Sequence, residues 1–136
     1  MSNTARTLFP AKLENLESMI GFIKDGAETY GFDNKKISQI HLASEEALVN
    51  IINYAYPDKN GSIEITYDTK EGKGLVIEII DWGIPFDPLS IPEPDIAAPI
   101  EDRTIGGLGI FFINKLVDEV QYRRDGKSNI LTLTIN

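Results

Sequence analysis

The sequence predicts an α+β fold, a two-layer α/β sandwich with helices on one face of a mixed, mostly antiparallel sheet. Segments of period-two apolar alternation and segments with apolar residues every three or four positions follow one another as β, α, α, β, β, loop, α, β, β. The chain has 136 residues and is 42% hydrophobic, enough for one domain with a real core. We therefore expect a single domain over residues 1–136.

Eight elements are expected in chain order. They are a strand at residues 5–9, helices at 12–30 and 34–55, strands at 63–67 and 75–80, a short helix at 110–116, and strands at 120–124 and 130–135. Gly31 suits the end of the first helix, because glycine is common at a helix C-terminus. Either Asp33 or Asn34 can cap the second helix. The strand at 63–67 alternates apolar and polar residues, whereas the strand at 75–80 is more fully apolar.

A long loop is expected between the two halves of the sheet. Residues 82–103 hold five of the seven prolines and show no periodicity. Loops of this length are uncommon inside a compact domain and are usually functional lids or disordered segments. The segment DGKS at residues 125–128 resembles the end of a P-loop, but Gln121 stands where that motif needs glycine. DGKS is therefore interpreted as a hairpin turn.

Composition and charge narrow the class of function. The chain has no cysteine, which excludes disulfides and thiolate metal sites. Its formal net charge of −8 argues against direct nucleic-acid binding and against an anionic membrane surface. No apolar run approaches the roughly 20 residues that span a bilayer, and the N-terminus lacks the apolar core of a signal peptide. We expect a soluble, cytoplasmic protein whose partners are small ligands or other proteins.

The second predicted helix carries a polar stripe inside an apolar stretch, SEEALVNIINYAYP. Glu46, Asn50 and Asn53 fall within about 60° of one another around the helix. Each of these residues can simply face solvent. However, a long solvent-facing stripe usually carries more charge, and Leu42 and Val49 flank this one closely. One carboxylate and two amides with apolar flanks therefore favour the wall of a pocket.

The stripe is chemically suited to phosphoryl transfer. Glu46 can orient an attacking hydroxyl group and accept its proton. The amide oxygen of Asn50, about one helical turn later, is a hard neutral ligand of the kind that Mg²⁺ accepts beside water and phosphate oxygens. A glutamate followed four residues later by an asparagine is a weak signal alone, since many helices contain that pair by chance.

Two further motifs, DWGIPFD and GGLG, offer contacts for a nucleotide. Asp81 ends an apolar strand, where its carboxylate can accept a hydrogen bond from the exocyclic amine of adenine, an edge at which guanine presents a carbonyl. The alternative is a strand-ending turn, with Gly83 supplying a positive φ. Gly106, Gly107 and Gly109 precede a helix, where backbone N–H groups can approach phosphates closely. A hinge or a plain helix start is the alternative there.

In this order, the three motifs resemble those of the Bergerat-fold (GHKL) ATPases, the superfamily of gyrase, heat-shock chaperone, histidine-kinase and mismatch-repair ATPases. EEALVN resembles the N box, DWGIPFD the first glycine box and GGLG the second. Within that superfamily, SEEALVNIINYAYP, PFDP and GGLGIFFINKLVDEV are similar to the small serine-protein kinases that act as bacterial anti-sigma factors. The resemblance covers nearly the whole chain.

The resemblance implies a cytoplasmic serine/threonine-protein kinase that uses ATP and Mg²⁺ and regulates transcription. Such a protein holds a sigma factor or similar regulator, phosphorylates a STAS-like anti-anti-sigma antagonist, and by analogy forms a homodimer. Glu46 would be the general base and Asn50 the Mg²⁺ ligand, with residues 87–106 as the ATP lid. The nucleotide-binding residues that it implies are Asn50, Asn53, Asp81, Gly83, Gly106, Gly107, Leu108, Gly109 and Thr132.

The chain departs from the family at several positions. Tyr54 stands where relatives often have histidine, and Ile105 stands where some have an arginine, with Arg103 only nearby. A threonine that helps to hold adenine is replaced at about Asn129, which leaves Thr132 as a substitute. The missing arginine keeps a second function open, an ATP-binding interaction module with little or no kinase activity. A plain α/β interaction domain that binds no nucleotide is a third.

Overall fold

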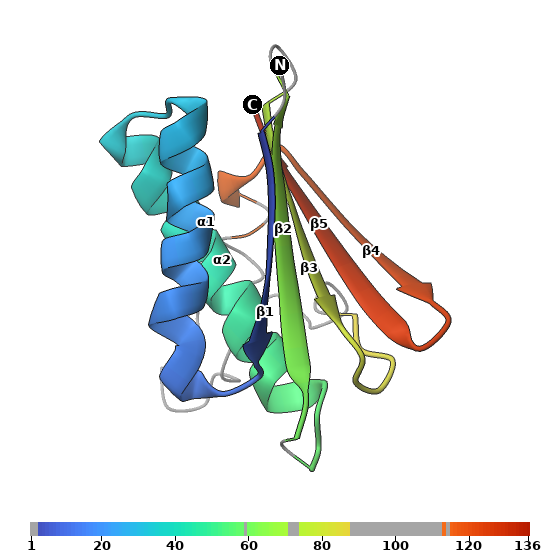
Figure 1. Cartoon of the computed structure of the whole chain (residues 1–136). Helices are drawn as coiled ribbons and strands as arrows, with labels where there is room; N and C mark the ends of the chain where they lie inside the picture. The colour runs from blue at the N-terminus through green and yellow to red at the C-terminus, as the bar shows by residue number, and fades with distance from the viewer. Residues whose placement is uncertain (1–2, 59, 71–73, 88–112, 114) are drawn as a thin grey trace, which may run out of the picture.

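Five strands and two long helices form the two layers of the computed structural model, which describes residues 3–58, 60–70, 74–87, 113 and 115–136 (Figure 1). The strands are β1 (Asn3–Pro10), β2 (Ser62–Lys70), β3 (Gly74–Asp81), β4 (Glu119–Asp125) and β5 (Ser128–Ile135). Their order across the sheet is β1-β2-β3-β5-β4. The helices α1 (Leu16–Tyr30) and α2 (Asn34–Tyr54) follow a short 3-10 turn, η1 (Leu13–Asn15), and cover one face of the sheet.

This arrangement confirms the predicted α+β sandwich with one correction. Every strand pair in the described part of the chain is antiparallel, so the sheet is not mixed there. The predicted short helix is described only at Ile113, Lys115 and Leu116, which are helical. Within the described ranges, neither long helix combines the length and the hydropathy that crossing a bilayer requires.

The ends of the two helices follow from local sequence. Gly31 closes α1 with φ 101°, a left-handed conformation that glycine adopts without strain, and its N–H donates to the carbonyls of Ala27 and Glu28. Of the two candidate caps for α2, Asp33 is the one used, since its carboxylate accepts a 2.8 Å hydrogen bond from the backbone N–H of Lys36. These caps fix where α2 begins and therefore which of its residues meet the sheet.

The register of the sheet decides which side chains of β3 reach the helix layer. Ile77 and Ile79 are fully buried, and they pair with Leu133 and Leu131 of β5. Because side chains alternate between faces along a strand, Asp81 lies on the same face as these isoleucines, under the helices. The strand that builds the core therefore also delivers a carboxylate to the helix side of the sheet.

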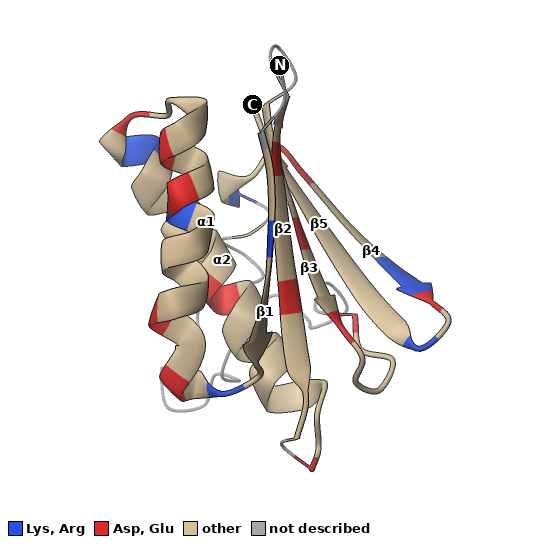
Figure 2. Cartoon of the chain, viewed as in Figure 1, with Lys and Arg blue, Asp and Glu red and all other residues tan. Residues whose placement is uncertain are grey.

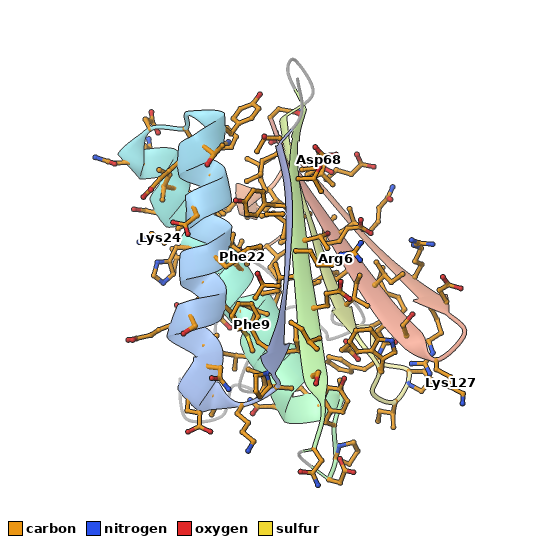
Figure 3. All side chains as sticks on the ribbon, viewed as in Figure 1. Arg6, Phe9, Phe22, Lys24, Asp68 and Lys127 are labelled. Atoms are coloured by element: carbon orange, nitrogen blue, oxygen red, sulfur yellow. The ribbon has the colours of Figure 1, made fainter. Side chains whose placement is uncertain are left out.

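Aromatic rings fill the space between α1 and the first two strands. Phe22 of α1 contacts Phe9 of β1, with ring centroids 6.2 Å apart (Figure 3). It also contacts Tyr67 of β2, with ring centroids 5.0 Å apart. The Tyr67 ring also lies directly against the backbone of Gly26, where an added Cβ would come within 2.8 Å of it. Glycine at position 26 is therefore explained by packing.

Two glycines in α1 make a matched test of this packing. We expect Gly26→Ala to destabilise the fold by about 1–3 kcal/mol, because a ring held by its neighbours must move. Gly21→Ala should instead stabilise it by about 0.5–1 kcal/mol, because no described atom lies within 4 Å of the new methyl group and alanine favours the helix. Urea unfolding of both variants measures the effects, and equal shifts of the two midpoints would contradict this packing.

Candidate functional site

The polar stripe of α2 does not face solvent as a whole. Asn50 is fully buried, whereas Glu46 and Asn53 are only partly exposed. Burial raises the pKa of the Glu46 carboxyl above its ordinary value of 4.5, and the neighbouring charge of Glu45 raises it further. For Asn50 the solvent-facing alternative is therefore wrong, and Glu46 lies at the edge between the core and the solvent.

Asn50 has an unusual environment for a buried amide. Neither its side-chain oxygen nor its nitrogen has a hydrogen-bond partner among the described residues. Leaving a buried polar group unpaired costs about 1–3 kcal/mol, so such a group normally has a partner, which for Asn50 is not among the described residues. A neutral amide oxygen in this position fits the kind of ligand that Mg²⁺ takes from a protein beside phosphate oxygens.

Replacing Asn50 separates folding from ligand binding. Asn50→Leu should stabilise the free protein by about 1 kcal/mol, because it removes at similar volume an amide with no partner among the described residues. It should also reduce the rise in melting temperature with Mg-ATP to the smaller rise expected with ATP and a chelator. The matched control is Ser44→Ala, since Ser44 is the other residue of α2 that is fully buried with its side-chain oxygen unpaired in the described structure. The control should keep the full rise. Thermal unfolding with and without Mg-ATP checks both variants, and an unchanged rise in Asn50→Leu would refute the assigned role.

Asp81 is the second buried polar group of the site, with 1% of its surface exposed. Its Oδ1 accepts hydrogen bonds from the backbone N–H of Gly83 (3.0 Å) and from Nδ2 of Asn129 (2.8 Å). Burial raises the pKa of Asp81, and these two hydrogen bonds and the nearby Arg124 charge partly oppose that shift. No hydrogen bond reaches its Oδ2 from the residues that the structure describes, which leaves one carboxylate oxygen for a ligand.

The turn that begins at Asp81 rests against the C-terminal end of α2. The N–H of Ile84 donates to the carbonyl of Ala55 (2.9 Å), and the N–H of Trp82 donates to the hydroxyl of Tyr56 (2.7 Å). A Cβ on Gly83 would come within 2.0 Å of the Ala55 carbonyl oxygen. Gly83 is thus needed for close backbone approach, and it is not among the glycines with positive φ. This contact brings the motif of Asp81 to the same end of α2 as Asn50.

Of the other residues that the sequence singled out, some lie near the Asp81 turn, one lies on the opposite sheet face, and the rest are outside the described residues. Tyr54, which replaces a histidine of many relatives, packs its ring on Phe86 with centroids 5.5 Å apart. Thr132 pairs with Glu78 and therefore lies on the sheet face opposite to Asp81, so the structure does not bring it to the site. Asn129 occupies the position beside Asp81 instead. The glycine-motif residues Gly106, Gly107, Leu108 and Gly109, together with Arg103 and Ile105 and all of the predicted lid except Asp87, lie outside the described residues.

Sequence reasoning missed three side chains around the Asp81 turn. Tyr56, Tyr122 and Arg124 each hydrogen-bond to this turn or to Asn129, which holds it. Nothing in the local sequence marks them, because Tyr122 and Arg124 come from a hairpin about forty residues later in the chain. The pairing of the strands could have indicated Arg124, because it places Arg124 opposite Asn129 and Asn129 opposite Asp81.

Comparison with known proteins agrees with this geometry. The sequence model of the family named histidine kinase-like ATPase domain matches residues 9–135 of this chain. The serine-protein kinases RsbW of Bacillus thuringiensis and Bacillus anthracis are each 31% identical over 126 residues, which cover 90% of this chain and 78% of theirs.

A solved structure shows the same fold. The crystal structure of the RsbU and RsbW domains of Rv1364c from Mycobacterium tuberculosis is similar with a TM-score of 0.67 and 16% identity. The similarity covers 98% of this chain, which spans about a third (32%) of that solved chain. The matched domain and the RsbW relatives together show that the chain belongs to the histidine kinase-like ATPase family. Within it, the chain belongs to the branch of the anti-sigma serine-protein kinases.

Proposed function

We propose that this chain binds Mg-ATP and phosphorylates a serine of a small STAS-like anti-anti-sigma protein in a cytoplasmic partner-switching pathway. The single observation that carries this proposal is the buried amide of Asn50, which has no partner in the described structure, one helical turn after Glu46. The names of the matched relatives, serine-protein kinases, support the same reaction.

The two buried polar groups give the proposed site two ends. At one end, Oδ2 of the buried Asp81 would accept a hydrogen bond from the exocyclic amine of adenine. At the other, the Asn50 oxygen would hold Mg²⁺, which when bound neutralises charge on the phosphates. Asn53 lies in α2 between Asn50 and the C-terminal end of the helix, against which the Asp81 turn rests, and it would line the pocket. By resemblance, the backbone at Gly106, Gly107, Leu108 and Gly109 would contact the phosphates.

Glu46 is the proposed general base. Its carboxylate accepts the proton of the attacking serine hydroxyl as the serine oxygen forms its bond to the γ-phosphorus. The bond between that phosphorus and the bridging oxygen breaks, and ADP leaves with its electron pair. Because burial raises the Glu46 pKa, this carboxylate is a better proton acceptor than an exposed one would be.

The proposed partners follow from the family. The kinase would hold a sigma factor or a similar regulator as a homodimer and release it in response to the antagonist. A second candidate is an ATP-binding module with little or no phosphotransfer, which Ile105 favours because some relatives carry an arginine there. In both cases the partners are proteins, in keeping with the net charge of −8.

A phosphotransfer assay with a partner distinguishes the two candidates. The purified chain is incubated with Mg-ATP and the STAS-like proteins of the same organism, and phosphoserine is sought by mass spectrometry. The kinase predicts one modified serine that requires both ATP and Mg²⁺. Unmodified partners that nevertheless bind more tightly or more weakly when ATP is present would favour the interaction module.

A further inference from the structure

Asn129 of β5 is the centre of the hydrogen bonds that shape the adenine end of the proposed site. It is 2% exposed and lies opposite Asp81 in the β3–β5 register. Its Nδ2 donates two hydrogen bonds, to Oδ1 of Asp81 and to the carbonyl of Ile84, both at 2.8 Å. One amide group thereby fixes both the carboxylate and the backbone of the turn that follows it.

The oxygen of the same side chain is also occupied. Oδ1 of Asn129 accepts from the hydroxyl of Tyr122 (2.6 Å), from Nη1 of Arg124 (3.2 Å) and from the N–H of Phe86 (3.3 Å). Three donors on one side and two acceptors on the other determine the orientation of the amide, since the reverse orientation would place its oxygen against the Asp81 carboxylate. With both N–H groups used, Asn129 has no donor left for a base.

The hairpin of β4 and β5 supports this arrangement from outside the site. Nη1 of Arg124 also donates to the carbonyl of Gly83 (2.8 Å), and its Nε donates to the carbonyl of Gly126 in the hairpin turn (3.1 Å). Figure 2 colours the ribbon at this end of β4 blue for its basic residues, next to the acidic Asp125, although the chain as a whole is acidic. The hairpin thus holds the turn that presents Asp81.

We propose that Asn129 is the positioning residue that keeps Asp81 an ionised hydrogen-bond acceptor and so makes the site select a purine that carries an amine. This inference rests on the proposed function. An ionised Asp81 accepts from the adenine amine, whereas a protonated Asp81 can donate to the carbonyl of guanine. The other groups that face Asp81 are Arg124 and Tyr122 of β4 and Tyr56 after α2, of which only Arg124 carries charge that favours the ionised form.

Nucleotide binding by Asn129→Leu tests the proposal. Dissociation constants for Mg-ATP and Mg-GTP are measured by calorimetry from about pH 6 to about pH 9 in the wild type, Asn129→Leu and Thr134→Val, a control on the opposite face of the same strand. In Asn129→Leu we expect about tenfold or greater loss of ATP affinity, a smaller preference for ATP over GTP, and an acid-side loss of affinity that begins at higher pH. The control should match the wild type.

Other outcomes would overturn the proposal. Equal loss for ATP and GTP with an unchanged pH profile would show a merely structural role for Asn129. Wild-type protein that binds no ATP would refute the proposed function, and this inference with it, whereas a wild type and an Asn129→Leu variant that bind alike would refute the inference alone. Should Asn129→Leu not fold, Tyr122→Phe removes only the hydroxyl that donates a hydrogen bond to Oδ1 of Asn129. This variant should shift the preference for ATP over GTP and the pH profile of binding in the same direction, but by a smaller amount.

Discussion

Glu46→Gln is expected to lower the rate of serine phosphorylation by about 100- to 10,000-fold while leaving the affinity for Mg-ATP within about twofold of the wild type. Glutamine keeps the size and hydrogen-bonding oxygen of the side chain but cannot accept a proton. The loss should therefore appear in the transfer step. Initial rates of phosphoserine formation, with calorimetric binding of Mg-ATP beside them, measure the two effects separately.

The neighbouring Glu45 provides the control for this prediction. Its carboxylate lies 3.5 Å from His41 on another side of α2, so Glu45→Gln should retain transfer. A base works only when ionised, and the Glu46 pKa is raised, so the rate should fall as the pH drops through that raised pKa. Since Glu45 is the second cause of the shift, Glu45→Gln should move this fall to lower pH. Transfer that survives in Glu46→Gln would show that another group accepts the proton.

Asp81→Asn is expected to weaken ATP binding by about 10- to 100-fold and, at neutral pH, to stabilise the free protein. Asparagine can still accept from Gly83 and Asn129 through its oxygen, but it presents an N–H₂ donor where the second carboxylate oxygen stood. That donor faces the adenine amine, which is also a donor. ATP affinity measured by calorimetry and unfolding free energy measured in urea give the two results.

The stability effect has a definite sign with pH. Because the folded-state pKa of Asp81 is raised, the stability that its neutral form contributes is fully present below the ordinary pKa of 3.8 and is lost as the pH rises through the folded value. The variant is neutral at every pH, so its advantage over the wild type should grow from acid toward neutral pH. A variant that binds ATP normally, or one that loses ATP binding and stability together at neutral pH, would contradict the role given to Asp81.

Local patterns in the sequence predicted most of the fold. The alternation in β2, the helical spacing in α1 and Gly31 at its end are all patterns that a few neighbouring residues carry. The choice of Asp33 over Asn34 as the cap of α2 was open, because both side chains can accept the same hydrogen bond. The fully antiparallel pairing of the described strands depends on contacts between distant segments, which no local pattern reports.

For the site, too, short sequence motifs predicted some residues, whereas contacts between residues far apart in the sequence could not be predicted. Glu46, Asn50 and Asp81 belong to short motifs, and the structure buries two of the three. The link between Asp81 and Asn129 joins residues 48 positions apart, and it exists only in one register of β3 and β5. Thr132 is three residues from Asn129, an odd number, so it faces the other side of the sheet.

We propose that Mg-ATP binds between Asn50 and Asp81. The melting temperature of the wild-type protein, measured with Mg-ATP, with Mg-GTP and with ATP plus a chelator, tests this directly. Trp82, the single tryptophan, follows Asp81 and is 45% exposed, so its fluorescence reports unfolding beside the site itself. Ligand that binds only the folded state raises the melting temperature by mass action. We predict a rise with Mg-ATP that is smaller with Mg-GTP and smaller without the metal. An unchanged melting temperature at about 10 mM Mg-ATP would contradict the claim.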